Sequence, residues 1–268
     1  MSKVLWILIL GFVFCCCCGG CAVNPVTGQD QFMLYTEQQD ITIGREYAPE
    51  VEKQMGGRIP KESLQNYVDS VGQGIARRSH RPDWEYHFIA VEDKTINAIA
   101  LPGGYVFITK GMLGKLKTEA QLAAILAHEI THIVARDSSA VMSREIGIGI
   151  LLSAATTEKT PQSVLIVADL ARQILGLCYS REQEKVADLG GLDYMVRAGY
   201  NPYGAVEVMQ ILQDQHAIRP IEFFSTHLSP QNRIEYLTQK IQTEYYELKD
   251  LKVGQEDYRK AVLEQLSN

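Results

Sequence analysis

The sequence predicts an α+β fold that is mostly helical and holds one small, mainly antiparallel sheet. Two observations carry this prediction. Apolar residues recur at helical spacing along most of the chain, whereas only Trp84 to Thr109 is rich in aromatic and β-branched residues with turn signals between them. With 268 residues, of which 46% are hydrophobic and 22% are charged, the chain is an ordinary globular sequence, long enough for one large domain or two small ones. The formal net charge of −6 does not suggest a nucleic-acid partner, for which a basic stripe is expected.

The first twenty residues differ in composition from the rest. Lys3 supplies a positive charge, and an apolar run from Val4 to Phe14 follows it. A charged start, a short apolar core and small residues before a cleavage point are typical of a secretory signal peptide, which we expect over residues 1–20. The alternative is a short N-terminal membrane anchor, although the run is shorter than the roughly 20 residues that a spanning helix needs.

The pair Gly19-Gly20 before Cys21 resembles a bacterial lipobox, which implies cleavage before Cys21 and a lipid on its sulfur. Cys18 departs from that pattern, because an aliphatic residue is usual there. Five of the six cysteines lie at or before Cys21 and only Cys178 remains in the body, so the processed chain cannot form an internal disulfide. We therefore expect a lipid-anchored protein of the bacterial cell envelope. Ala22 after Cys21 is compatible with the outer membrane, facing the periplasm.

Turn signals and periodicity divide the processed chain into three parts. Residues 21–60 predict a lipidated tether and an N-terminal helix that runs from Thr36 to Gln54, with a break near Gly44 or Pro49. Residues 61–240 predict the main domain, which begins with apolar residues at helical spacing from Leu64 to Ile75. Residues 241–268 predict a helical extension at the C-terminus.

Three short strands are expected in the main domain. They cover Trp84 to Val91, Ile96 to Leu101 and Tyr105 to Thr109. The turn Pro102-Gly103-Gly104 joins the last two strands and predicts an antiparallel hairpin.

Two helices with clear start signals follow the strands. Thr118 with Gln121, and Ser180 with Gln183, have the spacing of a capping box. Between these helices lie two apolar stretches, Ile146 to Ala155 and Val164 to Leu177. The first is too short to span a membrane, and the second contains charged residues. Their position between the two helices suggests that they cover the site described next.

The strongest chemical signal is His128-Glu129-Ile130-Thr131-His132, an H-E-x-x-H pattern within the first of these helices. Positions i and i+4 share one helix face, so both imidazoles can reach one Zn²⁺ ion. Glu129 points to a different side of the ion, where it is well placed to take a proton from a water molecule. The alternative, a chance pattern on a solvated helix face, is weakened by the apolar surroundings of the motif.

Catalytic zinc needs a third protein ligand and one open position. Glu184 and Asp188 lie one helical turn apart in the second helix, so Glu184 could bind the metal and Asp188 could orient a zinc-bound histidine. Glu182 is the competitor for the ligand role, but it has no acidic partner one turn later. A charged, solvated helix start is the other reading of this stretch.

At this point the sequence resembles the HtpX and CAAX prenyl protease group of zinc peptidases, in particular its periplasmic lipoprotein members and the BepA-like enzymes. Four blocks in the same order carry the resemblance: the strand Asn97 to Phe107, the helix Leu126 to His132, the stretch Ser180 to Asp188, and Ser225 to Ile234. The opening Cys21 to Gly28 also resembles the lipoprotein members. The resemblance implies a zincin-like metallopeptidase domain with one Zn²⁺ per chain.

The resemblance also assigns roles to residues. It implies that His128, His132 and Glu184 are the metal ligands, Glu129 is the general base and Asp188 is the partner of a ligand. It implies that His227 caps the metal in a resting state or stabilises the oxyanion. In the mechanism that we predict, Arg233 joins His227 in holding the tetrahedral intermediate. The substrate would pair with an edge strand made of Asn97, Ala98, Ile99, Ala100 and Leu101. Leu228 departs from the family pattern, which usually has proline after this histidine.

The function predicted from these observations is a zinc metalloendopeptidase that cleaves proteins, with misfolded or unassembled envelope proteins as the expected substrates. One alternative is an envelope lipoprotein with a chaperone or scaffold role and a capped or inactive metal site. A second alternative is a zinc hydrolase acting on a non-peptide amide or ester. The edge strand argues against it, because such substrates have no backbone to pair. The sequence leaves the oligomeric state open.

Overall fold

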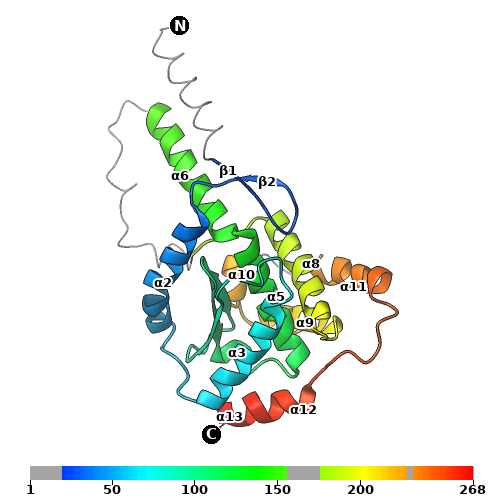
Figure 1. The fold of residues 1–268 in the computed structure, drawn as a ribbon. Helices are drawn as coiled ribbons and strands as arrows, with labels where there is room; N and C mark the ends of the chain where they lie inside the picture. The colour runs from blue at the N-terminus through cyan, green and yellow to red at the C-terminus, as the bar shows by residue number, and fades with distance from the viewer. Residues whose placement is uncertain (1–19, 156–175, 228–231, 268) are drawn as a thin grey trace, which may run out of the picture.

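The computed structural model of the chain describes residues 20–155, 176–227 and 232–267. These residues form a mostly helical α+β structure, as the sequence predicts, with a three-stranded sheet beside a bundle of helices (Figure 1). The expected leader lies outside the described residues except for Gly20, and so does most of the apolar stretch from Val164 to Leu177. No helix in the described ranges is long and apolar enough to cross a membrane.

The main sheet has the strand order β3–β5–β4, with bounds β3 His87–Val91, β4 Ala98–Leu101 and β5 Tyr105–Thr109. β4 and β5 pair antiparallel, which confirms the predicted hairpin. β3 pairs with β5 in parallel. The strand order therefore places β5 in the middle and β4 at one edge of the sheet. A separate antiparallel pair, β1 (Cys21–Val23) with β2 (Asp30–Phe32), precedes the main domain. Strand pairing in the described ranges is thus mainly antiparallel.

Helix α2 (Glu37–Gln54) packs beside the turn of the β4–β5 hairpin. A full capping box between Thr36 and Gln39 begins the helix. The predicted break near Gly44 or Pro49 is wrong, because α2 continues through both residues. Gly44 has a packing role instead: a Cβ atom there would lie 2.2 Å from the carbonyl oxygen of Pro102, so only glycine lets α2 approach the hairpin turn this closely.

The centre of the molecule is helix α5 (Glu119–Ala135), in which every residue is buried. It packs against strands β4 and β5 of the sheet and against helices α3 (Glu62–Ala76), α8 (Arg181–Arg197) and α9 (Tyr203–Ile218), and α3 also packs on β3 (Figure 1). Thr118 caps α5, and Ser180 forms a full capping box with Gln183 at the start of α8, as predicted. The remaining short elements are α4 (Lys110–Leu113), α10 (Phe223–Thr226), α11 (Arg233–Glu244), α12 (Gln255–Tyr258), η3 (Arg259–Leu263) and α13 (Glu264–Ser267).

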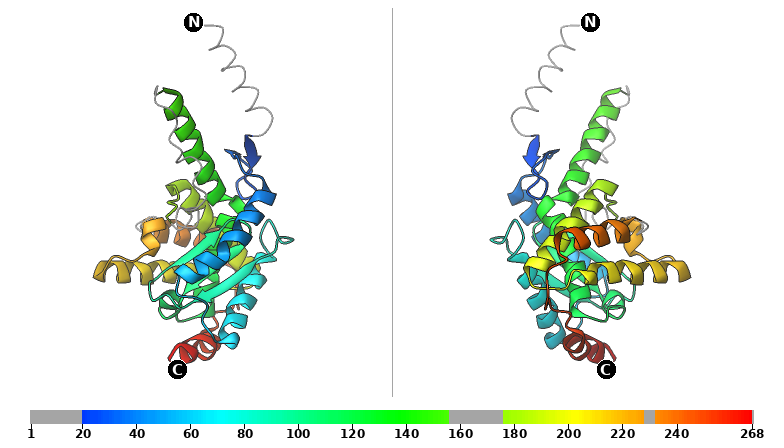
Figure 2. Two further views of the ribbon diagram at one scale, coloured as in Figure 1. Left: turned by 90° about the vertical axis from the view of Figure 1, so that its left-hand side faces the viewer. Right: turned by 90° about the vertical axis from the view of Figure 1, so that its right-hand side faces the viewer.

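Helix α6 (Asp137–Ala155) follows α5 almost immediately and projects from the body next to β1 and β2 (Figures 1 and 2). Arg136, between α5 and α6, adopts a left-handed conformation with φ 59°, which ends α5 and redirects the chain. The described part of the apolar connection between the two motif helices therefore leaves the body rather than lying over its centre. Residues 156–175 of that connection are outside the described ranges.

Candidate metal centre

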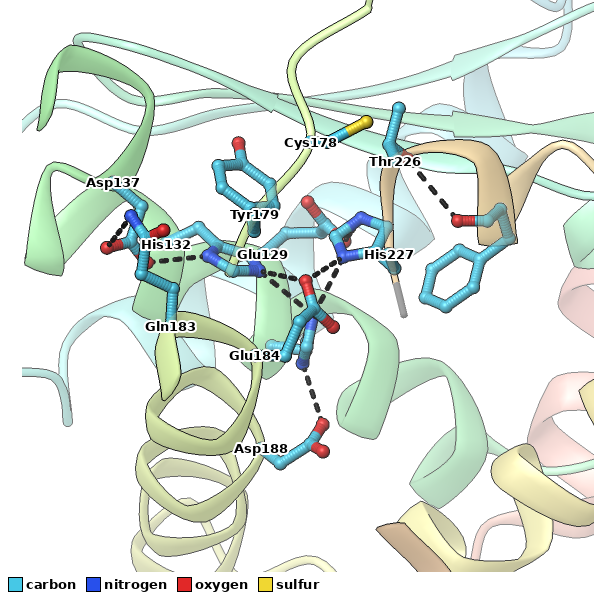
Figure 3. A network of polar contacts seen from close by, with 12 residues as sticks. Glu129, His132, Asp137, Cys178, Tyr179, Gln183, Glu184, Asp188, Thr226 and His227 are labelled. Atoms are coloured by element: carbon cyan, nitrogen blue, oxygen red, sulfur yellow. Dashed lines mark hydrogen bonds and ion pairs between the residues drawn. The ribbon is translucent and has the colours of Figure 1, made fainter. Parts of the chain in front are cut away.

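Four buried side chains from three parts of the fold converge on one point (Figure 3). His128 and His132 come from α5, Glu184 from the first turn of α8, and His227 directly follows α10. One ligand atom from each lies within 4.8 Å of the other three. The Nε2 atoms of His128 and His132 are 3.1 Å apart, and Nδ1 of His227 lies 2.7 Å from Oε1 of Glu184. Three imidazoles and one carboxylate are a donor set typical of zinc.

Close packing of α8 against α5 brings Glu184 to the histidines. The contact is made at Gly191, where a Cβ atom would lie 2.9 Å from the backbone nitrogen of His128. A larger residue would push the two helices apart. Gly191 positions the site although it carries no functional group, and the sequence analysis did not single it out.

Asp188 lies where the sequence predicts, one turn after Glu184 and beside a histidine. Its Oδ1 is 3.0 Å from Nδ1 of His128, so it can fix the tautomer that turns Nε2 toward the centre. Arg233 of α11 donates two hydrogen bonds to Asp188, at 2.8 and 2.7 Å, and its Nη1 is 3.1 Å from Oε2 of Glu184. The hydroxyl of Tyr236 also donates to Asp188. Arg233 thus lies behind the ligands, which makes it a positioning residue and argues against the predicted oxyanion contact.

Asp137 gives His132 the same support, and sequence reasoning missed it. Its Oδ2 is 2.7 Å from Nδ1 of His132, and its Oδ1 accepts a hydrogen bond of 3.0 Å from Gln183. Asp137 is 1% exposed. The two residues are five positions apart across a helix end, so helical periodicity does not place them together. The left-handed turn at Arg136 brings Asp137 and His132 together. The only feature of the sequence that could have indicated this role is the presence of an acidic residue just after the motif helix.

Aromatic rings enclose two of the histidines. Tyr179 stacks on His132 with ring centroids 4.0 Å apart, and its hydroxyl lies 2.9 Å from Oγ of Ser138. Phe223 stacks on His227 at 4.4 Å. These contacts restrict the rotation of the imidazoles and exclude water from the back of the centre.

Burial and the neighbouring carboxylates shift the pKa values of the two α5 histidines in opposite directions. Burial lowers the pKa of His128. For His132 burial acts in the same direction, but hydrogen bonds to Asp137 and Glu184 outweigh it and raise the pKa to about 10. Burial raises the pKa of Asp188, but the charge of Arg233 and the bond to His128 outweigh it and lower the pKa to about 2. Because His132 must lose its proton to bind a metal, binding should strengthen as the pH rises.

Glu129 is fully buried beside the four converging groups, and neither of its carboxylate oxygens has a hydrogen-bond partner. The Nε2 atom of His227 lies 3.6 Å from its Oε1. A buried carboxylate without a partner is costly. A metal ion with a water molecule at this point would supply the missing interactions, so the residues present fit a bound metal.

The predicted edge strand is β4, although Asn97 lies just before it. Backbone groups of an antiparallel strand alternate in direction. Because Asn97 O accepts from Thr109 N across the pair, Ala98 and Ala100 direct their backbone groups away from β5, along an edge where Ala98 is fully buried and Ala100 is 3% exposed. The side chain of Asn97 accepts a hydrogen bond of 3.0 Å from Ala98 N. The carbonyl of Ile96 accepts from Phe223 N, which ties this edge to the segment carrying His227.

Replacing Asp137 by asparagine is expected to weaken metal binding about 10- to 100-fold, because the amide loses the charge that orients and polarises His132. A competitive zinc titration with a chromophoric chelator would measure the change. Asp30→Asn, which removes an exposed carboxylate on β2, is the matched control and should leave the affinity unchanged. Wild-type affinity in Asp137→Asn would mean that the aspartate has no role in the centre.

Comparison with known proteins supports the reading of these residues. Residues 62–241 match the model of peptidase family M48. The chain is 30% identical over 185 residues to the putative beta-barrel assembly-enhancing protease of Vibrio cholerae, an alignment that covers 64% of this chain and 38% of that protein. It is 26% identical over 210 residues to the beta-barrel assembly-enhancing protease of Escherichia coli, covering 73% and 42% of the two chains.

A mitochondrial relative is also similar. The chain is 35% identical over 173 residues to the mitochondrial metalloendopeptidase OMA1 of Schizosaccharomyces pombe, covering 63% of this chain and 50% of that protein. The alignments thus span between about two fifths and half of the relatives' lengths. The resemblance to the HtpX and CAAX prenyl protease group is confirmed at the level of the family. Because the family match contains all four converging residues, this chain belongs to peptidase family M48.

Proposed function

We propose that the protein is a zinc-dependent metalloendopeptidase whose peptidase domain covers residues 61–240. The observation that carries this proposal is the unpartnered, buried carboxylate of Glu129 beside His128, His132 and Glu184. A purely structural metal site has no use for such a group, whereas peptide hydrolysis needs a base there. Membership of family M48 supports the same conclusion.

In the proposed mechanism His128, His132 and Glu184 hold one Zn²⁺ ion. When bound, the ion supplies positive charge that polarises the scissile carbonyl and acidifies water. Glu129 takes a proton from the attacking water and delivers it to the leaving amine. Asp188 and Asp137 keep the imidazoles of His128 and His132 in the orientation that the reaction needs.

The proposed substrate is an extended polypeptide that pairs with β4. The C=O groups of Ala98 and Ala100 and the N–H of Ala100, which face away from β5, would bind its backbone, which gives affinity with little dependence on sequence. Loose selection of this kind suits the removal of misfolded or unassembled proteins. Two of the relatives are named beta-barrel assembly-enhancing proteases, which supports envelope proteins as the substrate class.

We propose further that the protein is anchored by lipid on Cys21 after cleavage of residues 1–20, and that it works at the outer membrane facing the periplasm. The charged and apolar start of the chain and the small residues before Cys21 support this location. Cys21 is exposed at the start of β1, which is compatible with a lipid on its sulfur.

One observation favours the alternative of a closed metal site. His227 joins the other three donors as a fourth potential ligand, and a catalytic zinc site keeps one position open. We therefore propose that His227 caps the centre in a resting state. Replacing it by alanine is expected to raise peptide cleavage at unchanged zinc content. Lower cleavage in His227→Ala would assign the residue to turnover instead.

Casein cleavage by the purified, processed protein tests the function. The native protein is compared with a chelated sample and with the same sample after zinc is restored. Activity that disappears on chelation and returns with zinc is the expected result. Zinc binding with no cleavage in either the native protein or His227→Ala would contradict the peptidase function and favour a chaperone or scaffold role.

A further inference from the structure

The strands β1 and β2 lie beside α6 at the end of the molecule where α6 projects (Figures 1 and 2). Four large apolar side chains are exposed on these elements or just after β2. They are Val23 (58% exposed), Phe32 (44%), Leu34 (42%) and Ile148 (45%). We call this group the hairpin–α6 face. Leaving large apolar groups in water is unfavourable, and a cluster of them marks an interaction surface more often than scattered single residues do.

The strand register places Cys21 within this face. Cys21 pairs with Phe32 and Val23 pairs with Asp30, so these four side chains share one side of the two-stranded ribbon. Ala22 and Gln31 occupy the other side. That side faces the body, because Gln31 donates a hydrogen bond of 2.8 Å to the carbonyl oxygen of Ala135. The cysteine that would carry the lipid therefore points outward together with Val23 and Phe32.

The ribbon and α6 are held together as one surface. Leu34 N donates a hydrogen bond of 2.9 Å to Oγ of Ser143 on α6. The ring of Phe32 lies beside Gly147, where a Cβ atom would be 3.4 Å from it. The lipid site and the base of the projecting helix are thus fixed relative to each other.

Beyond this contact the sequence of α6 becomes wholly uncharged. No Asp, Glu, Lys or Arg occurs from Ile146 to Thr157, whereas Arg144 and Glu145 just before this stretch are exposed. The 19 residues of α6 extend about 28 Å at 1.5 Å per residue. Such a helix, charged at its base and apolar toward its end, suits the boundary between lipid headgroups and acyl chains.

We propose that the hairpin–α6 face docks onto the bilayer that holds the lipid of Cys21. This inference rests on the lipid anchor of the proposed function. The anchor favours a bilayer over a protein as the occupant, because acyl chains on Cys21 leave from the same outward side as Val23 and Phe32. Anchoring would hold these side chains at the membrane surface, where they can insert between the lipids.

Docking of this face would also fix the orientation of the metal centre relative to the membrane. Helix α6 begins at Asp137, whose carboxylate contacts His132, so the docked element connects directly to the centre. The protein would be held in one orientation by a rigid two-point attachment rather than hanging from a flexible tether.

Fluorescence of a label at position 148 tests the proposal. The full chain is expressed so that it is processed and lipidated, and Cys178→Ser leaves an introduced cysteine as the reactive one. Ile148→Cys is labelled with nitrobenzoxadiazole and reconstituted into phosphatidylethanolamine–phosphatidylglycerol vesicles that contain a lipid with a doxyl quencher on its acyl chain. Ile218→Cys is the matched control, because Ile218 is an isoleucine 78% exposed at the end of α9, away from this face.

The label at 148 is expected to shift to the blue and to lose roughly half of its emission to the lipid quencher, while the label at 218 changes little. Adding Val23→Glu and Phe32→Glu to the Ile148→Cys protein should reduce the quenching. Equal quenching at 148 and 218 would overturn the proposal. A blue shift without quenching would also overturn it, since a second copy or another protein would then cover the face.

Flotation of the same vesicles separates this inference from the proposed anchor. Protein that floats with the vesicles but carries an unquenched label at 148 would leave the anchor standing and refute the docked face. Protein that fails to float would refute the anchor, and the docked face would fall with it. The metal-dependent casein assay is independent of both outcomes.

Discussion

Glu129→Gln is expected to lower peptide cleavage by about 10²- to 10⁴-fold, the range that a positioned general base contributes. The amide keeps the size of the side chain but cannot accept a proton. Because neither oxygen of Glu129 has a hydrogen-bond partner, the replacement breaks no hydrogen bond in the fold. Zinc content and thermal stability should therefore remain those of the native protein, so that the loss falls on catalysis alone.

The measurement is initial-rate cleavage of casein at saturating zinc, with bound metal determined on the same samples. Glu182→Gln is the matched control, since it makes the same change at an exposed position on α8, two residues from Glu184. The control should cleave at the native rate. Near-native cleavage by Glu129→Gln would remove this residue from the mechanism.

Arg233→Met is expected to destabilise the metal-free protein by about 3–5 kcal/mol, as removal of one partner from a buried ion pair does. Arg233 is 4% exposed and serves the carboxylates of both Asp188 and Glu184. Methionine fills the space but leaves two buried negative charges without their cation. Unfolding in guanidinium chloride, followed by circular dichroism, measures the change.

Arg259→Met is the control for this substitution, because Arg259 forms its ion pairs at the surface with its side chain 47% exposed. Its loss should cost much less stability than the loss of Arg233, because solvent screens ion pairs at the surface. Saturating zinc should reduce the effect of Arg233→Met, since a bound cation compensates the charge of Glu184. Equal stability of the two variants would mean that Arg233 contributes nothing at this position beyond packing.

Local patterns in the sequence were sufficient for the elements that carry the site. The capping residues Thr118 and Ser180 begin their helices as predicted, because a side-chain acceptor for free backbone N–H groups acts within one turn. The i, i+4 spacing of His128 and His132 places them on one face for the same local reason. The expected break in α2 was wrong, because Gly44 serves a contact with a distant turn and Pro49 is accommodated inside the helix.

The metal centre itself could be only partly predicted. The sequence by itself determined the motif helix, the pairing of Glu184 with Asp188 and the edge hairpin, since each depends on residues a few positions apart. Only the tertiary structure decided that Asp137 supports His132, that Arg233 lies behind the ligands, and that the ribbon carrying Cys21 packs against α6. These contacts join residues across helix ends or far along the chain, where periodicity carries no information and the packing of whole elements sets the distance.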